Sequence, residues 1–325
     1  MISKTTLLYL SIATTATAIG ACVILKPASF SQFGSQFSIF KCLGQRSRCS
    51  KSSVSALKSP EEWVSFEVIG NSKVTHNSHL VTMKLPLGTT RLGLTMNSCL
   101  LARMKTATGD YHVKPYTPIS SEDEISKSGT FSLLVKKYPN GTLSRHICEL
   151  KQGDMLDMKG PIAKINLEQR SPNGTIASLE GVSRLAMIAG GTGITPMLQA
   201  AEHILKSTPE KNSPKISLIS ANDSSEDILA SEQLENLVNL YPNRIEVHHV
   251  LRNNEGMKSA TSGLVTCTVL EKLCVVPAET QKVFVCGPLP MMTAVCGSKA
   301  KNMDQGPLEG VLSELGFTSD QVYKF

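Results

Sequence analysis

The sequence predicts a β plus α/β fold, in which an antiparallel β-barrel is followed by a parallel α/β domain. Two observations carry this prediction. Between residues 60 and 170, short runs of β-forming residues are separated by Gly, Pro, Asn and Asp. From residue 184 onward, apolar strand-like runs instead alternate with helix-like segments. At 325 residues, the chain has room for two such domains and one additional segment.

The additional segment is N-terminal. Residues 5–25 are uncharged and mostly apolar, and at roughly 1.5 Å per residue such a helix would cross about 30 Å of hydrocarbon. We therefore expect a membrane anchor with its flank at 1–30 and a basic, Ser-rich tether at 31–59. Because the flank after the apolar run is basic, the bulk of the protein is expected in the cytosol. A cleaved signal peptide or a basic, acid-poor transit peptide remains the alternative.

Charge is concentrated in this leader. The first 60 residues contain seven cations and no acid, which leaves 26 cations against 27 acids in the rest of the chain. The net charge of +6 therefore belongs to the leader, and the folded part offers no basic excess for nucleic acid. The nine cysteines include no C-x-x-C pair and the histidines are scattered, so neither a disulfide framework nor a metal site is predicted.

The barrel half contains two stretches whose residues could bind a ligand. Lys114–Ser120 is an extended, proline-braced segment that presents a cation, an aromatic ring and a hydroxyl. Asn140–Ser144 opens a short helix, whose first backbone N–H groups suit an anion. Taken singly, each also fits a turn or a helix cap. The strands expected around them lie at 64–69, 79–85, 131–135 and 155–158.

In the α/β half, a strand, a tight turn and a helix start follow one another directly. The apolar strand ends at Gly190 and Gly191, and the helix begins with Thr195 as N-cap and Pro196 in the first position. Glycines here, with Gly193, let a phosphate-bearing ligand approach the backbone at the positive end of the helix. Because the spacing is G-x-G-x-x-P and not the dinucleotide fingerprint, simple turn chemistry is the alternative.

The remaining segments of the α/β half also alternate between strand-like and helix-like patterns, which indicates a Rossmann-like parallel sheet. One strand leaves Cys286 at its carboxyl end, where open α/β sheets bind ligands. The domain boundary is expected in the polar stretch 168–182, which gives domains at 60–170 and 182–325. Strands are expected at 185–189, 216–220, 245–250 and 283–286, and helices near 195–206, 226–240, 264–274 and 290–300. The first helix places Met197, Ala201, Ile204 and Leu205 on one face.

Four motifs in this order resemble the ferredoxin-reductase-like flavoproteins, and within them the NADH-cytochrome b5 reductases. They are K-P-Y-T-P-I-S from Lys114, G-T-L-S from Gly141, G-G-T-G-I-T-P-M from Gly190 and C-G-P-L-P-M from Cys286. The resemblance covers about residues 60 to 325. The C-terminal run from Asp304 is most similar to the membrane-anchored mitochondrial branch.

The resemblance implies FAD on the barrel and NADH approaching from the α/β domain. Tyr116 would lie against the flavin and Thr117 would hydrogen-bond near its N5, while Cys286 would orient the nicotinamide ring. Thr117 and Cys286 are therefore the expected catalytic residues. The expected cofactor-binding residues are Lys114, Pro115, Tyr116, Thr117, Ser120, Lys136, Gly141, Thr142, Leu143, Ser144, Gly190, Gly191, Thr192, Gly193, Thr195, Pro196, Cys286, Gly287, Pro288 and Met291.

Two residues depart from the family pattern. Lys114 stands where the family usually has Arg, so the charge is kept but the bidentate fork is lost and FAD is expected to be held less tightly. Arg252 follows the third expected strand of the α/β domain, where NADH-using relatives often carry Asp. An arginine there could attract the extra phosphate of NADPH. NADH is the expected donor, with NADPH as the alternative.

The resemblance implies that a hydride passes from NADH to FAD and that single electrons then pass to a cytochrome b5-like haem protein. The expected location is the mitochondrial outer membrane with the catalytic part facing the cytosol, or alternatively the endoplasmic reticulum. A quinone or another acceptor is a second possibility, and a non-catalytic membrane scaffold that has lost its cofactor is a third. Candidate docking cations for an acidic haem protein are Lys84, Arg91, Arg103, Lys105 and Lys137.

Overall fold

The computed structural model describes residues 54–172, 174–301 and 303–325, which belong to one compact unit. The predicted anchor at 1–30, and the predicted tether up to residue 53, lie outside the described residues. Within the described ranges, no helix has both the length and the apolar character that crossing a bilayer requires.

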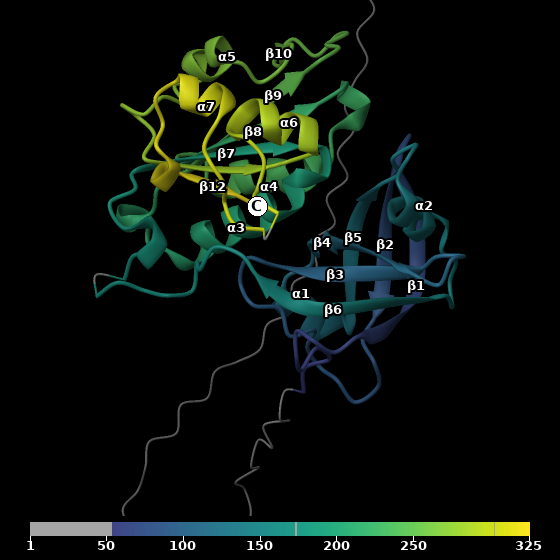
Figure 1. Ribbon diagram of the computed structural model, residues 1–325. Coiled ribbons are helices and arrows are strands. Elements are labelled where there is room, and N and C mark those ends of the chain that lie inside the picture. The colour runs from purple at the N-terminus through teal and green to yellow at the C-terminus, as the bar shows by residue number, and fades with distance from the viewer. Residues whose placement is uncertain (1–53, 173, 302) are drawn as a thin grey trace, which may run out of the picture. The chain divides into compact units, whose positions relative to one another are not determined.

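The first domain is built on a six-stranded antiparallel sheet in the order β4-β3-β6-β1-β2-β5 (Figure 1). Its core includes Phe66 and Phe131, which are buried and meet edge to face with ring centroids 5.1 Å apart. The elements are β1 (Val64–Thr75), β2 (Ser78–Lys84), β3 (Ser98–Lys105), β4 (Tyr111–Tyr116), α1 (Glu122–Ser128), β5 (Thr130–Lys136), α2 (Thr142–Glu149) and β6 (Met155–Ala163).

The four strands expected in this domain are confirmed; β1, β5 and β6 are longer than expected, and β2 is shifted by one residue. The expectations omit β3 and β4. β4 is an edge strand of the sheet, and every residue from Tyr111 to Pro115 is exposed. Its sequence alternates apolar and polar residues from Tyr111 to Lys114, but the run is short and ends at Pro115, and a proline argues against a strand in a sequence. Lys114 to Tyr116, singled out for their chemistry, form the end of this strand.

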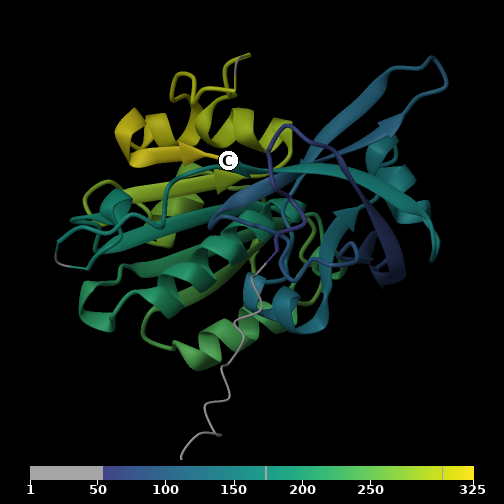
Figure 2. The same cartoon turned by 90° about the horizontal axis from the view of Figure 1, so that it is seen from below.

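The second domain is a parallel sheet in the order β10-β9-β8-β7-β11-β12. Helices cover both of its faces, as Figure 2 shows. Its strands are β7 (Arg184–Gly190), β8 (Lys215–Asn222), β9 (Ile245–Leu251), β10 (Thr261–Ser262), β11 (Lys282–Cys286) and β12 (Val322–Lys324). Its helices are α3 (Ile194–Ser207), α4 (Ser231–Leu240), α5 (Cys267–Lys272), α6 (Leu289–Cys296) and α7 (Gly310–Glu314), with single 3₁₀ turns at Ala177–Leu179, Gly191–Gly193, Glu210–Asn212, Ser225–Asp227 and Ser319–Gln321.

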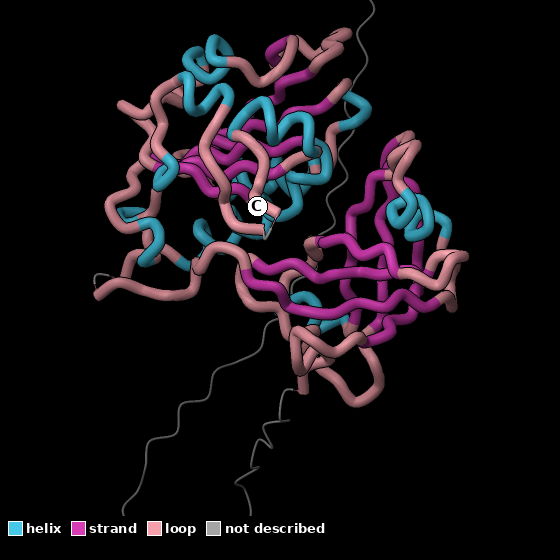
Figure 3. The backbone as a smooth tube through the Cα atoms, in the orientation of Figure 1, coloured by secondary structure: helices cyan, strands magenta, loops and turns pink. Residues whose placement is uncertain are grey.

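Two hydrophobic clusters hold these layers together. One joins α3 and α4 to the sheet, and the other joins α5, α6 and α7 to its opposite face. The apolar stripe predicted on the first helix is confirmed, because Met197, Ala201, Ile204 and Leu205 are all buried. The alternation of strands (magenta) and helices (cyan) in this domain is visible in Figure 3.

The start of α3 differs from the expectation. Its N-cap is Gly193, and Thr195 lies inside the first turn, where its hydroxyl donates to the carbonyl of Thr192 at 3.1 Å. Pro196 is the third helical residue. Proline fits there because N–H groups in the first turn have no acceptor within the helix. The tight 3₁₀ turn Gly191–Gly193 brings the chain into the helix earlier than the sequence suggests.

The C-terminal strand β12 was not expected either. It lies parallel to β11 and carries Lys324, whose side chain is almost completely buried. The Lys324 ammonium donates to the carbonyls of Pro307 at 2.6 Å and Ser298 at 3.3 Å. A buried charge that is satisfied only by distant carbonyls gives no apolar signal in the sequence, so the strand could not be recognised there.

Candidate functional site

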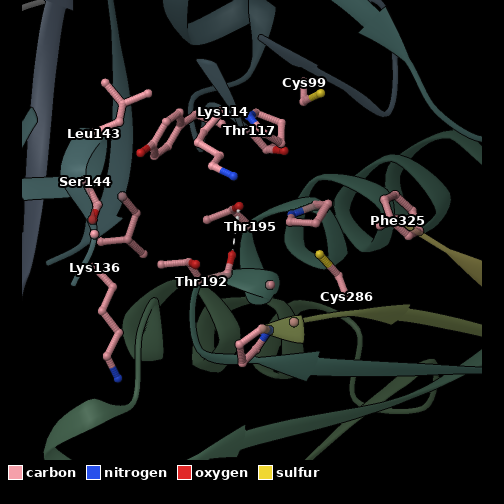
Figure 4. A pocket seen from close by; sticks show the side chains of 18 of the residues that line it. Cys99, Lys114, Thr117, Lys136, Leu143, Ser144, Thr192, Thr195, Cys286 and Phe325 are labelled. Carbon is pink, nitrogen blue, oxygen red and sulfur yellow. Dashed lines mark hydrogen bonds between the residues drawn. The ribbon is translucent and has the colours of Figure 1, made fainter. Parts of the chain in front are cut away.

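A cavity of about 670 Å³ is lined by both domains, and we call it the main cavity (Figure 4). The barrel contributes the end of β4 and the loop into α2. The α/β domain contributes the carboxyl ends of β7 and β11 with the turns that follow them. The predicted residues on its wall are Lys114, Pro115, Tyr116, Thr117, Lys136, Gly141, Thr142, Leu143, Ser144, Thr192, Gly193, Thr195, Pro196, Cys286, Gly287 and Pro288.

On the barrel side, β4 delivers a cation and an aromatic ring. Tyr116 packs against the barrel core, and its burial raises the pKa of the phenol, which is therefore neutral at physiological pH. Lys114 pairs in register with Ala102 of β3 and is exposed. Its ammonium has no ion-pair partner among the described residues and is drawn toward the cavity in Figure 4. A free cation beside an aromatic ring suits a flavin nucleotide with its anionic pyrophosphate.

The start of α2 forms a cradle for an anion. Gly141 is the N-cap, and a Cβ on it would collide with the Ser144 hydroxyl. Ser144 is buried, and its Oγ has no hydrogen-bond partner within the described part of the chain. An unsatisfied buried hydroxyl costs about 1–3 kcal/mol, so an acceptor or donor from a ligand is expected to complete it. Together with the free N–H groups of the first helical turn, this arrangement fits the pyrophosphate of FAD.

On the opposite side, two turns at the ends of β7 and β11 touch each other. A Cβ on Gly193 would collide with the Cys286 carbonyl, and one on Gly190 would collide with the Met291 sulfur. These two glycines are therefore required by the packing of one turn on the other. Neither interpretation of the sequence, approach of a ligand or simple turn chemistry, includes this contact between the two turns. Gly191 (φ 51°) differs, since its nearest neighbour, the Tyr138 hydroxyl, would lie 3.8 Å from a Cβ.

Cys286 is the last residue of β11 and presents its sulfur to the main cavity (Figure 4). Burial raises the pKa of its thiol to about 12, so the side chain is neutral at physiological pH. A neutral thiol of this kind is not an activated nucleophile. It is suited to packing against a neutral ring and to positioning it.

A second cavity, of about 450 Å³, adjoins the same turns and contains the other predicted residues of the α/β domain. Gly190, Gly191 and Met291 line it, and Lys136 and Pro288 line both cavities. Two charged side chains at its wall follow β8 and β9. These are Asp223 and Arg252, paired at 3.3 Å between Oδ1 and Nε.

Ser120 is the one predicted residue that the structure does not place at either of these cavities. Its hydroxyl accepts the backbone N–H of Ser132 at 3.0 Å, and it therefore fastens the segment after β4 to β5. This is a structural contact within the barrel. The proline-braced stretch predicted from the sequence thus divides into a part that faces the cavity and a part that holds the strand in place.

Lys136 is held by an acid from the other domain. Its Nζ lies 2.8 Å from Asp227 Oδ1, and both side chains are largely buried. Asp227 also accepts from Asn77 Nδ2 at 3.0 Å and lies 3.7 Å from His76 Nε2, both in the turn between β1 and β2. Asp227 was not predicted, because the sequence of a polar loop does not indicate which distant residues an acid in it will contact.

Further lining residues were also missed. Phe325 follows β12 and contacts Phe284 and Tyr323, with centroid distances of 5.6 and 5.1 Å. Its amide donates to the Val285 carbonyl at 2.9 Å, which fixes it beside the end of β11. Asn140, which begins the stretch singled out before α2, also lines the main cavity. The other unpredicted residues on its wall are Asn97, Ser98, Cys99, Leu134, Tyr138, Lys164, Gln199 and Met303. Their places depend on contacts between segments far apart in the chain.

Three of the five candidate docking cations are engaged within the protein. Arg91 pairs with Glu122, Arg103 with Asp157 and Lys137 with Glu149. Arg103 is also stacked between two rings, with its guanidinium 4.2 Å from the Trp63 centroid and 4.5 Å from that of Tyr111. Lys84 and Lys105 are exposed and form no ion pair with any described residue. They are the two members of the set whose charge is available to a partner.

The two domains match two family models. Residues 65–167 match the oxidoreductase FAD-binding domain, and residues 187–297 match the oxidoreductase NAD-binding domain. The cytochrome b5 reductase domain of Ulva prolifera nitrate reductase has a similar structure, with a TM-score of 0.67 and 26% sequence identity, over 84% of this chain and 100% of that one. Fold and site therefore define a two-domain flavoprotein oxidoreductase of the ferredoxin-reductase-like type.

Sequence relatives identify the family to which the chain belongs within this class of flavoproteins. The chain is 40% identical over 272 residues to NADH-cytochrome b5 reductase 2 of Pyricularia oryzae, which is 83% of this chain and 78% of the relative. It is 35% identical over 270 residues to the protein of the same name from Yarrowia lipolytica, covering 83% and 88%. The chain belongs to the NADH-cytochrome b5 reductase family. The fold predicted from the pattern of strands and helices and the family predicted from the four motifs are both confirmed.

Proposed function

We propose that this chain takes a hydride from NADH onto bound FAD and passes the electrons one at a time to a cytochrome b5. The observation that carries this proposal is that the main cavity is shared between the domains. The cation, aromatic ring and anion cradle of the barrel face the same space as Thr195 and Cys286 of the α/β domain. Donor and acceptor rings bound to the two sides would therefore meet there.

The residues of this chain act by binding and positioning. The Ser144 hydroxyl, the first turn of α2 and the Lys114 ammonium would hold the FAD pyrophosphate, and Tyr116 would support the flavin. Cys286, kept neutral by burial, would pack against the nicotinamide. A bound flavin supplies two-electron acceptance and single-electron release, so no protein acid or base is required.

The direct test is an absorption spectrum of the purified full-length chain before and after anaerobic NADH. We expect a flavin spectrum that NADH bleaches, and its release on denaturation should yield FAD. A colourless protein that cannot be reconstituted with FAD would contradict the proposal and favour a scaffold that has lost its cofactor.

The acceptor is tested separately by varying salt. If an acidic cytochrome b5 docks on exposed cations such as Lys84 and Lys105, kcat/KM for its reduction should fall steeply with ionic strength. Reduction of a small neutral quinone serves as the control, because it should change little over the same range. A salt-independent rate with cytochrome b5 would remove the electrostatic docking step.

We also propose that residues 5–25 anchor the protein in the mitochondrial outer membrane with the catalytic domains in the cytosol. The uncharged apolar run, its basic flank and the C-terminal similarity to the mitochondrial branch support this location. Protease treatment of intact mitochondria should then degrade the catalytic domains. Recovery of the protein with endoplasmic reticulum markers would support the alternative membrane.

A further inference from the structure

The ends of β8 and β9 bring two opposite charges together at the second cavity. Asp223 follows β8 and Arg252 follows β9, and the two segments are joined by backbone hydrogen bonds from Arg252 to Asn222 and from Asn253 to Asp223, at 3.1 and 2.8 Å. The side chains pair at 3.3 Å and remain 58% and 63% exposed, respectively. They are therefore held at one place and are still open to a ligand.

The rest of this cavity suits the adenosine part of a dinucleotide. Its wall is mostly apolar, with Val250, Leu264 and Val265 on one side and the glycine turn at Gly190 and Gly191 beside them. The remaining charged group on this wall, among the residues described, is Lys136, which is already paired with Asp227. Asp223 and Arg252 are thus the charges that a ribose in this cavity would meet.

The two charges favour different nucleotides. A carboxylate at the end of a strand in such a sheet accepts from the ribose hydroxyls of NADH, whereas an arginine accommodates the 2′-phosphate of NADPH. Considered alone, Arg252 would favour NADPH. Because its Nε is turned to Asp223, a 2′-phosphate would have to enter beside a carboxylate and compete with it for the guanidinium.

We propose that Asp223 is the residue that determines nucleotide choice. It neutralises Arg252 and repels a 2′-phosphate, and so it keeps the enzyme selective for NADH despite the arginine. This inference rests on the proposed function, because it assumes that the second cavity receives the adenosine half of the electron donor.

The test uses the full-length holoprotein and the variants Asp223→Asn and Arg252→Gln. The matched control is Glu226→Gln, which removes the same charge from the same loop but does not line the cavity. Binding of 5′-ADP and of 2′-phospho-5′-ADP is measured by calorimetry, and kcat/KM is measured for NADH and NADPH. The decisive quantities are the ratio of the two dissociation constants and the ratio of the two kcat/KM values. A purely structural defect would weaken binding and reaction of both nucleotides equally and leave these ratios unchanged.

We expect Asp223→Asn to shift both ratios toward the 2′-phosphorylated nucleotide by about tenfold, and Arg252→Gln to shift them the other way. Glu226→Gln should leave both ratios within about twofold of wild type, since a charge away from the bound ribose acts on both nucleotides alike. An unchanged ratio in Asp223→Asn, or an equal loss for both nucleotides, would overturn the inference. If neither NADH nor NADPH reduces the protein but the calorimetric ratio still shifts, the proposed function fails, whereas the role of Asp223 in excluding a 2′-phosphate from the cavity stands.

Discussion

At the scale of single residues, Ser144 is a buried side chain at the site whose hydrogen bonding is incomplete. It is buried, it faces the main cavity, and its hydroxyl lacks a partner among the described residues. Ser120, two elements earlier, is the converse case, because its hydroxyl is engaged with the backbone of Ser132 and does not reach the cavity. The two serines therefore form a matched pair for separating a ligand contact from a structural one.

We predict that Ser144→Ala weakens FAD binding about tenfold, as expected for the loss of one hydrogen bond to a charged group, without lowering the free energy of unfolding of the FAD-free protein. Ser120→Ala should instead leave the FAD dissociation constant unchanged and lower the free energy of unfolding by about 1 kcal/mol. Flavin fluorescence on dilution and urea unfolding measure the two quantities. Equal loss of FAD in both variants would show that Ser144 does not contact the cofactor.

A second prediction at this scale concerns Lys114, whose ammonium has no ion-pair partner in the described part of the protein. Lys114→Arg restores a planar fork that can bind a pyrophosphate with two parallel hydrogen bonds. We expect slower release of FAD, by a factor of about 3 to 10, in a dilution experiment that follows flavin fluorescence. Unchanged flavin loss would place the pyrophosphate elsewhere.

The sequence indicated the site residues that lie on short continuous motifs, because a strand end or helix start fixes its own backbone donors. Lys114 to Thr117 and Gly141 to Ser144 belong to this group. Asp227 and Phe325 could not be predicted, because each reaches the site through contacts with segments at least 40 residues away in the sequence. Nothing in a local pattern records which partner such a residue will meet.

At the scale of elements, the turns after β7 and β11 behave as one unit. Neighbouring strands in a parallel sheet end at the same edge, and here Ala189 lies in register with Cys286. The expected strands β7, β8 and β11 are runs that are mostly buried. β9 is buried only at its ends, with Glu246, His248 and His249 between them. The contact between the turns after β7 and β11 depends on backbone separation, which periodicity does not encode.

Gly193→Ala tests this contact. The added Cβ would meet the Cys286 carbonyl, so the two turns must separate, and we expect a loss of about 2–3 kcal/mol in unfolding free energy and a raised KM for NADH. Gly191→Ala is the comparison, because its Cβ would make only an ordinary contact with the Tyr138 hydroxyl at 3.8 Å and the left-handed backbone alone would cost about 1–2 kcal/mol. A larger defect at Gly191 than at Gly193 would contradict this ordering.

At the scale of the whole molecule, the two domains are fastened by Asp227 of the α/β domain. It is contacted by Lys136, Asn77 and His76, all from the barrel. Burial raises the pKa of the Asp227 carboxyl, but the hydrogen bonds from Lys136 and Asn77 outweigh it, and the pKa ends below its usual range. Because Lys136 lines both cavities, the same contact fixes a positive charge between them.

The lowered pKa of Asp227 determines how the free energy of unfolding depends on pH. A carboxyl whose pKa is lower in the folded state adds stability above its unfolded pKa of about 3.9, and that contribution disappears as pH falls through the folded value. We therefore expect Asp227→Asn to cost about 1–3 kcal/mol at pH 7 and the difference from wild type to shrink steadily below about pH 4. Urea unfolding of both proteins at pH 7, 5 and 3 measures it, and Glu226→Gln, which removes an exposed acid from the same turn, is the control. A difference that is constant across these pH values would mean that the contact between the domains does not depend on the charge of Asp227.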